Sequence, residues 1–217
     1  MRTFGFPEFL FILEAAQWTL ALSAIAFVGG AILGLLIALM RTSESTWARA
    51  VSTTFIQIFQ GTPLLLQLFL VFFGAPVLGL DINPWIAAGV ALILNSAAFL
   101  GEIWRGCIEA IPRGQWEAAQ ALNLKYVDRM RDVVLPQAFK IALAPTVGYL
   151  VQIIKGTSLA AIIGFVEVTR AGQIVNNATF QPLIVFSVVA AIYFVICWPL
   201  SLLAANMERK RARALAR

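Results

Sequence analysis

Residues 18–40 read WTLALSAIAFVGGAILGLLIALM, a stretch without a single charged side chain, and Arg41 follows it directly. A helix needs about 20 mostly apolar residues to cross the hydrocarbon of a bilayer. The stretch therefore predicts a membrane-spanning helix, because it is too long for a secretory signal and lacks a clear cleavage site. Residues 4–16 mix apolar and acidic side chains, and we expect them to form a short interfacial helix leading into this span.

The composition of the whole chain also indicates a membrane protein. Of its 217 residues, 60% are hydrophobic and 12% are charged, whereas soluble domains carry about 25% charged residues. We expect one polytopic membrane domain over residues 1–217, since the chain is too short for a second sizeable unit. The absence of histidine excludes histidine bases and histidine metal ligands, and no metal site is predicted. Cys107 and Cys197 lie far apart in apolar runs, which favours buried thiols over a disulfide.

Four more apolar segments follow the first. They are residues 55–80, interrupted at Gly61-Thr62-Pro63; residues 85–108; residues 138–154, followed by a broken-helix segment at 155–168; and residues 183–205. The expected fold is an all-α polytopic membrane protein with five membrane-spanning helices.

Basic residues predict the orientation of these spans. Of the 16 lysines and arginines, most follow the first span, surround the segment 111–137, or lie in the C-terminal tail. Because cytoplasmic loops are rich in Lys and Arg, we expect the N-terminus outside and the C-terminus in the cytoplasm. The alternative reading of the +5 net charge is nucleic-acid binding. It is rejected because the charges form no soluble basic face.

The segment 111–137 is more than a simple connector. Pro112 suits the first turn of a short helix over Gln115–Leu122, and Asn123 suits the left-handed residue that closes it. A second short helix is expected over Tyr126–Val134, and Pro136 then starts the next membrane helix. On physical grounds the segment is either a docking element for a cytoplasmic partner or a loop lying on lipid headgroups.

Residues 117–123, EAAQALN, followed by LPQA at 135–138, resemble the EAA motif of ABC-importer permeases. Val133 fills the apolar position of that motif. Two residues depart from it: Asn123 stands where Gly is usual, and Lys125 where Ser or Thr is common, so we expect the second helix to lose its side-chain cap.

Other segments resemble the polar-amino-acid subfamily, which includes histidine, arginine, glutamine and glutamate permeases. They are QGTPLLLQL at 60–68, NSAAF at 95–99 with EIWRG at 102–106, IPRGQWE at 111–117 and KGTSL at 155–159. Gln60 replaces the usual Arg, and Gly156 stands where Asp, Ser or Asn is more common. With the EAA motif, the resemblance covers roughly residues 55–173.

The resemblance implies a type I ABC importer transmembrane domain in a bacterial inner membrane. It implies pairing with a second permease, identical or paralogous, docking on an ATP-binding cassette ATPase dimer, and delivery of an amino acid by a periplasmic or tethered binding protein. The residues it assigns to ATPase coupling are Glu117, Ala118, Ala119, Asn123, Leu135 and Pro136. No cofactor is expected on this chain, which has no phosphate-loop motif, so ATP and Mg would bind the partner ATPase.

Polar residues inside the spans are candidates for the substrate path. Asn95 and Ser96 lie about 15 Å into their span, where transporters place substrates, although they would equally serve as hydrogen-bonding contacts between helices. Gln60 and Gln67 share one face with Gln57 if the helix continues through Pro63, lining either a polar route or the contact with the second permease.

A second group, Glu102, Arg105 and Glu109, is spaced for an ion-pair ladder near the cytoplasmic surface. A structural role for this ladder is favoured over substrate contact.

The sharpest substrate hypothesis concerns Lys155-Gly156-Thr157-Ser158. Thr157 or Ser158 is expected to cap a new helix starting near Leu159, and that helix N-terminus together with Lys155 would favour a carboxylate. Alternatively, Lys155 reaches the outer surface and the hydroxyls only cap. In the first span, the small residues Gly30 and Gly34 are expected to let another helix of the chain approach closely.

The function expected from the sequence is an ATP-driven permease subunit, not itself an enzyme, that imports polar amino acids by alternating access. One alternative is an ion-coupled secondary transporter, which predicts carboxylates at mid-depth; none is found there. The other is a non-transporting membrane scaffold that recruits a cytoplasmic protein.

Overall fold

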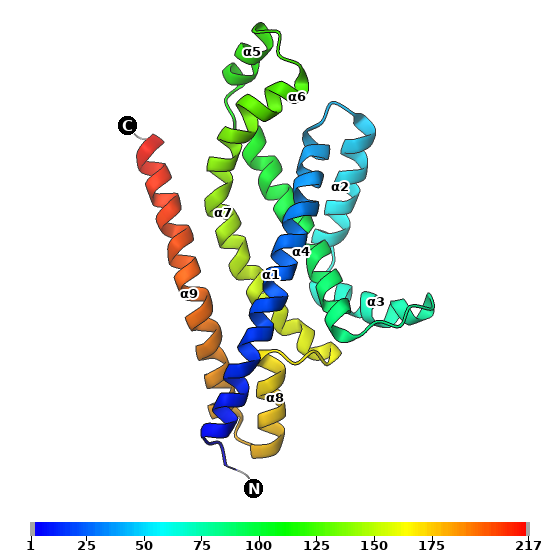
Figure 1. The fold of residues 1–217 in the computed structure, drawn as a ribbon, viewed down its shortest axis with the longest axis vertical. Coiled ribbons are helices and arrows are strands. Elements are labelled where there is room, and N and C mark those ends of the chain that lie inside the picture. The colour runs from blue at the N-terminus through cyan, green and yellow to red at the C-terminus, as the bar shows by residue number, and fades with distance from the viewer. Residues whose placement is uncertain (1–2, 216–217) are drawn as a thin grey trace.

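The computed structural model describes residues 3–215, with side chains placed for residues 3–213, and within this range every regular element is a helix (Figure 1). The long helices are α1 (Phe6–Thr42), α4 (Pro84–Glu109), α7 (Leu135–Gly156) and α9 (Pro182–Leu215). The shorter ones are α2 (Thr46–Gly61), α3 (Leu64–Val77), α5 (Arg113–Ala121), α6 (Tyr126–Asp128) and α8 (Val168–Thr179), with a π-turn over Arg129–Val134 and a 3-10 segment over Thr157–Ile163.

Helix α1 is longer than predicted. The separate interfacial helix expected over residues 4–16 is wrong, because α1 runs without a break from Phe6 to Thr42. It starts where the Glu8 carboxylate accepts a hydrogen bond from the backbone N–H of Gly5 (3.0 Å). Pro7 sits in the first turn, where its missing N–H costs nothing.

Helices α1 and α4 approach each other closely at two glycines of α1. A Cβ added at Gly30 would lie 2.5 Å from the Ser96 Cβ, and one added at Gly34 would lie 3.1 Å from the backbone of Ala97 and Gly101. Only glycine permits this approach, so the prediction that Gly30 and Gly34 bring another helix of the chain close is confirmed.

The second predicted span is bent. Residues 55–80 divide into α2 and α3, whose axes differ by 102°. Thr62 and Pro63 separate the two helices, and the ring of Pro63, with no N–H to donate, prevents α2 from continuing. Gln57, Gln60 and Gln67 therefore do not share a face of one straight helix. Within the described residues four helices are long and apolar enough to cross a membrane, and the bent pair makes five if it is counted as one span.

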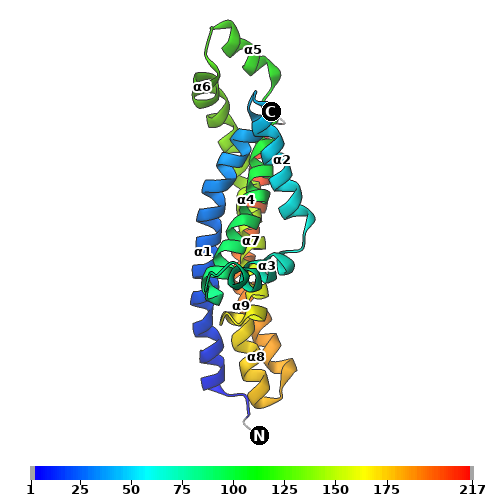
Figure 2. The ribbon, with the colours of Figure 1, turned by 90° about the vertical axis from the view of Figure 1, so that its right-hand side faces the viewer.

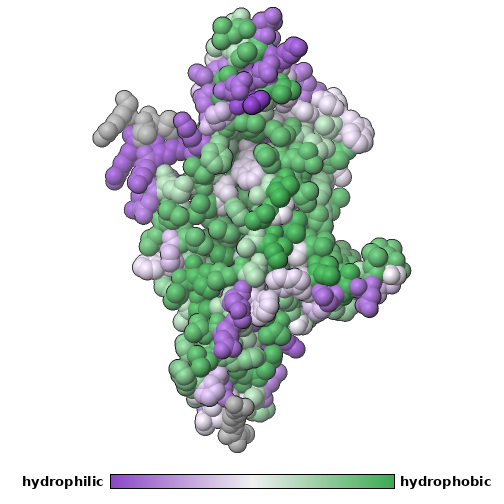
Figure 3. Space-filling view, viewed as in Figure 1, coloured by the Kyte–Doolittle hydropathy of each residue, from purple (hydrophilic) through white to green (hydrophobic). Residues whose placement is uncertain are grey.

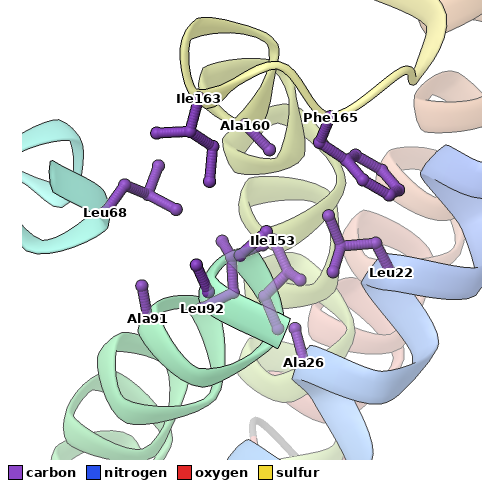
Figure 4. Close-up of a cluster of buried hydrophobic side chains, with 11 residues drawn as sticks. Leu22, Ala26, Leu68, Ala91, Leu92, Ile153, Ala160, Ile163 and Phe165 are labelled. Atoms are coloured by element: carbon purple, nitrogen blue, oxygen red, sulfur yellow. The ribbon is translucent and has the colours of Figure 1, made fainter. Parts of the chain in front are cut away.

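One buried apolar cluster ties the bent pair to the rest of the bundle. Figure 4 shows Leu68 of α3 pointing toward Leu92 of α4 and Ile163 of the 3-10 segment, with Leu22 and Ala26 of α1 and Ile153 of α7 closing the cluster. At its edge Trp18 meets Trp85 edge-to-face, with ring centroids 5.8 Å apart, and Phe165 packs on Trp85 at a tilt, with centroids 5.0 Å apart. The horizontal course of α3 is thus fixed by burial of apolar side chains.

The molecule has two distinct ends. Figures 1 and 2 both place α5, α6, the α1–α2 turn and the C-terminal end of α9 at the same end of the molecule, opposite the N-terminus. Figure 3 shows hydrophilic surface concentrated at that end and on the last turns of α9, above a broad apolar belt. The three basic groups that predict orientation therefore lie at one end of the bundle.

Candidate functional site

The first candidate site is the segment between α4 and α7. Helix α5 begins after Pro112. Two backbone hydrogen bonds close its C-terminal end: Leu124 N–H donates to the Ala119 carbonyl (3.2 Å), and Asn123 N–H donates to the Gln120 carbonyl (2.8 Å). This closure requires a left-handed residue, and Asn123 has φ 58°. The prediction for Asn123 is confirmed, so the departure from Gly leaves the turn intact.

The second half of the segment is less regular than predicted. The helix expected over Tyr126–Val134 exists, but α6 covers only Tyr126–Asp128 and widens into the π-turn that runs directly into α7. Lys125 precedes α6 without a side-chain cap, as its replacement of Ser or Thr predicts. The π-turn is thus continuous with a membrane helix, and α6 joins α7 without an intervening loop.

Arg129 joins this segment to the α1–α2 turn. Its guanidinium lies 6.0 Å from the centre of the Trp116 ring and 5.8 Å from that of Tyr126, within cation–π range. It also pairs with Glu44 (3.6 Å), and the Tyr126 hydroxyl donates to the Thr42 carbonyl (3.2 Å). These contacts hold α5 and α6 against the end of α1 as well as against α7.

The six coupling candidates divide by exposure. Glu117, Ala118, Asn123 and Pro136 are exposed, Leu135 is half-buried, and Ala119 is buried at 2% exposure. Leu122 beside them is an apolar side chain with 76% exposure. Val127 of α6 is a second exposed apolar side chain in this projecting segment, at 69%. The coupling role of the six candidates stays a prediction.

The second candidate site is the bend between α2 and α3. The Gln67 side-chain amide donates to the carbonyls of Phe59 (2.8 Å) and Thr62 (3.0 Å), while its oxygen accepts from Asn95 Nδ2 (3.1 Å). Gln67 and Asn95 are both buried, and they satisfy carbonyls that the break at Pro63 leaves without helical partners. Sequence reasoning identified both residues, but their contacts here are with the backbone of the bend.

The candidates Asn95, Gln60 and Ser96 also contact other groups near the bend. Tyr149 OH donates to Asn95 Oδ1 (3.4 Å), and Gln60, whose side chain is exposed, donates to the Ala98 carbonyl (3.3 Å). Ser96 is buried where α4 meets Gly30. The substrate role expected for Gln60, Gln67, Asn95 and Ser96 stays a prediction.

The segment 155–168 differs from the expectation. No new helix begins near Leu159, because α7 passes directly into the 3-10 segment and Gly164, with φ 87°, ends it. The Thr157 hydroxyl donates to the Ile154 carbonyl (2.7 Å) and the Ser158 hydroxyl to the Lys155 carbonyl (2.6 Å). The predicted caps are therefore wrong, because both hydroxyls face back along the preceding turn.

The anion site built on that helix start also loses its N-terminus. Lys155 is exposed, forms no ion pair among the described residues, and lies close enough to Cys197 of α9 for a Coulombic interaction. Among the described residues, no hydrogen bond joins Lys155 to Gln67 or Asn95. The substrate role of Lys155, Thr157 and Ser158 stays a prediction from the sequence.

The ion-pair ladder on α4 has the expected geometry. Arg105 Nε donates to Glu102 Oε2 (2.9 Å), Arg105 Nη2 donates to Glu102 Oε1 (2.5 Å), and Arg105 Nη1 donates to Glu109 Oε2. Both carboxylates on this face are therefore engaged by one arginine.

Sequence reasoning missed Glu167. Its carboxylate is fully buried, caps α8 by accepting from the N–H groups of Thr169 (2.9 Å) and Arg170 (2.8 Å), and accepts from Tyr193 OH of α9 (2.7 Å). Burial raises the pKa of the Glu167 carboxyl, and these donors oppose that rise. An acidic residue just before an amphipathic helix was the available signal. Val168 N–H donates to Thr19 of α1 (3.3 Å), which ties the start of α8 to that helix beside Glu167.

Comparisons with known proteins agree with this arrangement. The sequence is 34% identical to the probable amino-acid ABC transporter permease protein YckA of Bacillus subtilis, over 94% of this chain and 91% of that protein. It is 35% identical to the glutamine transport system permease protein GlnP of Escherichia coli K12, over 94% of each. It is also 35% identical to the L-cystine transport system permease protein TcyB of Bacillus subtilis, over 92% of this chain and 86% of that protein.

Solved structures give the same fold. A crystal structure of an amino acid ABC transporter with histidines superposes with a TM-score of 0.87 at 33% identity, covering 96% of this chain and 100% of that one. The MetNI methionine ABC transporter, at 18% identity and a TM-score of 0.79, shares the fold. The expected all-helical type I importer architecture is confirmed. Residues 30–213 match the profile of the binding-protein-dependent transport system inner membrane component family, and the chain belongs to that family.

Proposed function

We propose that this chain is the membrane permease of an ATP-driven importer of polar amino acids, working by alternating access in a bacterial inner membrane. The observation that carries the proposal is the exposed helix α5, held on a rigid base and joined through the π-turn to α7. Two relatives are named as permeases of glutamine and L-cystine transport systems, which supports amino acids as the substrate class. The clustering of basic residues at one end supports a cytoplasmic C-terminus and an external N-terminus.

The energy for transport would come from a partner. Glu117, Ala118 and Asn123, with Pro136 at the start of α7, form the surface on which an ATP-binding cassette ATPase docks and closes. The buried Ala119 and the half-buried Leu135 support that surface from the inside. ATP and Mg bind that ATPase, and this chain acts without an ATPase site or cofactor of its own. A second permease, identical or paralogous, completes the pathway, and a periplasmic or tethered binding protein delivers the amino acid.

Lys155 and Gln60 are the substrate-path candidates whose side chains remain exposed. We assign Lys155 to the amino-acid carboxylate because it is a cation at the end of α7 that forms no ion pair with the residues that the structure describes. Uptake into vesicles by the reconstituted complex tests this: Lys155→Met should raise the substrate concentration needed for half-maximal uptake. Lys140→Met, which removes an exposed lysine near the other end of α7, serves as the matched control. Unchanged uptake in Lys155→Met would remove Lys155 from the path.

The coupling assignment is tested separately with Glu117→Lys. The change reverses one exposed charge on α5 and should weaken ATPase association and substrate-stimulated ATP hydrolysis. Gln120→Lys, on the same helix and also exposed, adds a charge outside the assigned set. An intact complex with normal stimulated hydrolysis in Glu117→Lys would show that α5 is not the lever.

ATP dependence separates the proposal from its alternatives. The purified permeases, their ATPase and the binding protein should take up the amino acid found on that binding protein only when ATP is inside the vesicle. Uptake driven by an ion gradient without the ATPase would instead establish a secondary transporter, and assembly without uptake would favour a scaffold.

A further inference from the structure

A polar cavity of about 410 Å³ lies under helix α5, away from the residues assigned to transport. It is lined by the end of α1, the start of α2, the end of α4 and the inner face of α5, through Arg41, Thr42, Ser43, Arg49, Ile108, Glu109 and Trp116. Its volume is within the range of small-molecule sites.

Two arginines in this cavity form no ion pair with the residues that the structure describes. Three carboxylates lie nearby, but Glu102 and Glu109 are paired with Arg105, and Glu44 is paired with Arg129. This leaves Arg41 and Arg49 unpaired, and it leaves these seven groups with a net charge of +1.

The remaining contacts of these two arginines are with uncharged groups. Arg41 Nη1 donates to Thr53 Oγ1 (2.8 Å), while Arg41 Nε is buried and has no hydrogen-bond partner among the described residues. Arg49 donates to the carbonyls of Ser43 (2.8 Å) and Glu44 (3.1 Å). Both guanidiniums are therefore held in place by uncharged groups, while Arg41 also has a Coulombic attraction to Glu102, which shares Arg105 with Glu109.

The cavity lies at the level of lipid headgroups. Arg41 directly follows the apolar run of the first span, and Glu109 is the last residue of α4. Trp47, in the first turn of α2, has 75% exposure, and exposed tryptophans gather at membrane interfaces. Trp116 forms the wall toward α5, so the cavity is on the membrane side of that helix while Glu117 and Ala118 face outward.

We propose that this cavity binds the headgroup phosphate of an anionic phospholipid from the cytoplasmic leaflet. Guanidiniums recognise phosphate through paired N–H donors, which Arg41 and Arg49 supply, and the surplus charge of +1 over the seven groups favours an anion. An occupied site would connect the α1–α2 turn to Trp116 of α5. The shared chemistry is a phosphate anion, and the depth of the site selects lipid over free phosphate.

Lipid retention by the purified complex tests the proposal without any transport measurement, so its failure is separate from failure of the proposed function. Native mass spectrometry would count phosphatidylglycerol bound to the complex carrying Arg41→Gln and Arg49→Gln. A juxtamembrane arginine contributes about fivefold to the attraction of an anionic lipid, so the double change should reduce retention about 30-fold. The double variant Arg131→Gln and Lys140→Gln removes two exposed charges outside the cavity, so it measures the general attraction of basic residues for anionic lipid, and the loss in the cavity variant should exceed it.

Three further measurements complete the test. Arg41→Lys with Arg49→Lys keeps the charge and should keep most of the retention; if the Gln double variant does not assemble, Arg49→Gln alone should lose about fivefold. Equal retention in the cavity and control variants would overturn the proposal, as would displacement of the lipid by inorganic phosphate. Unchanged retention with loss of the ATPase would also overturn it, and would assign the arginines to an acidic side chain of that partner.

Discussion

Replacing Gln67 by leucine removes the amide that supports the bend between α2 and α3. Gln67 Nε2 donates to Phe59 O and Thr62 O, and Asn95 Nδ2 donates to Gln67 Oε1. Phe59 O keeps a second donor, Asn95 Nδ2 at 3.4 Å. The change therefore leaves one carbonyl without its donor, at about 1–3 kcal/mol, and breaks one interhelical bond of about 0.6–1.7 kcal/mol.

Together these terms predict a loss of about 2–5 kcal/mol, which for a chain of this size lowers Tm by about 4–20 °C. Thermal denaturation of the purified complex, followed by tryptophan fluorescence, measures the shift. Gln60→Leu is the matched control, since this exposed side chain makes a single bond of 3.3 Å to Ala98 and should cost under about 1 kcal/mol. Equal Tm values for the two variants would refute the assignment of Gln67 to the bend.

Three other substitutions test separate contacts. Gly30→Ala should destabilise the chain by about 1–3 kcal/mol in denaturation experiments, because its Cβ meets α4 at 2.5 Å, whereas Gly148→Ala, with nothing within 4 Å, should be neutral or stabilising. Asn123→Gly should keep or improve thermal stability and Asn123→Val should lower it by about 1–2 kcal/mol, since φ is 58° there; the reverse order would reject the left-handed closure of α5. Tyr193→Phe removes the 2.7 Å donor to the buried Glu167 carboxylate and should cost about 1.5–3 kcal/mol, and an unchanged Tm would show that this bond contributes nothing.

The elements predicted best are those set by local chemistry. The span predicted at 85–108 is the helix Pro84–Glu109, because Asn83 caps it, Pro84 starts it, and apolar residues continue to its end. The closure of α5 at Asn123 was equally predictable, since few residues accept a positive φ. The course of α3 was not, because Pro63 shows that a helix breaks and not where the chain goes next.

The polar candidates show the same division. The spacing of Glu102, Arg105 and Glu109 on one helix is enough to predict their ion pairs. No spacing links Gln67 to Asn95, which lie 28 residues apart in the chain. Thr157 and Ser158 were assigned as caps because a break resembles a helix start, but a 3-10 continuation satisfies their hydroxyls locally.

A helical membrane protein with a structured loop between two spans follows from the amino-acid sequence, because hydropathy, proline and left-handed residues act over a few positions. Which polar groups meet depends on the packing of the helices. Gln67 and Asn95 are joined at the bend, Glu167 is buried against Tyr193, and Arg41 and Arg49 line one cavity without an ion pair among the described residues. A buried polar group must find a partner in three dimensions, and the packing of α1, α4 and α7 selects which one is near.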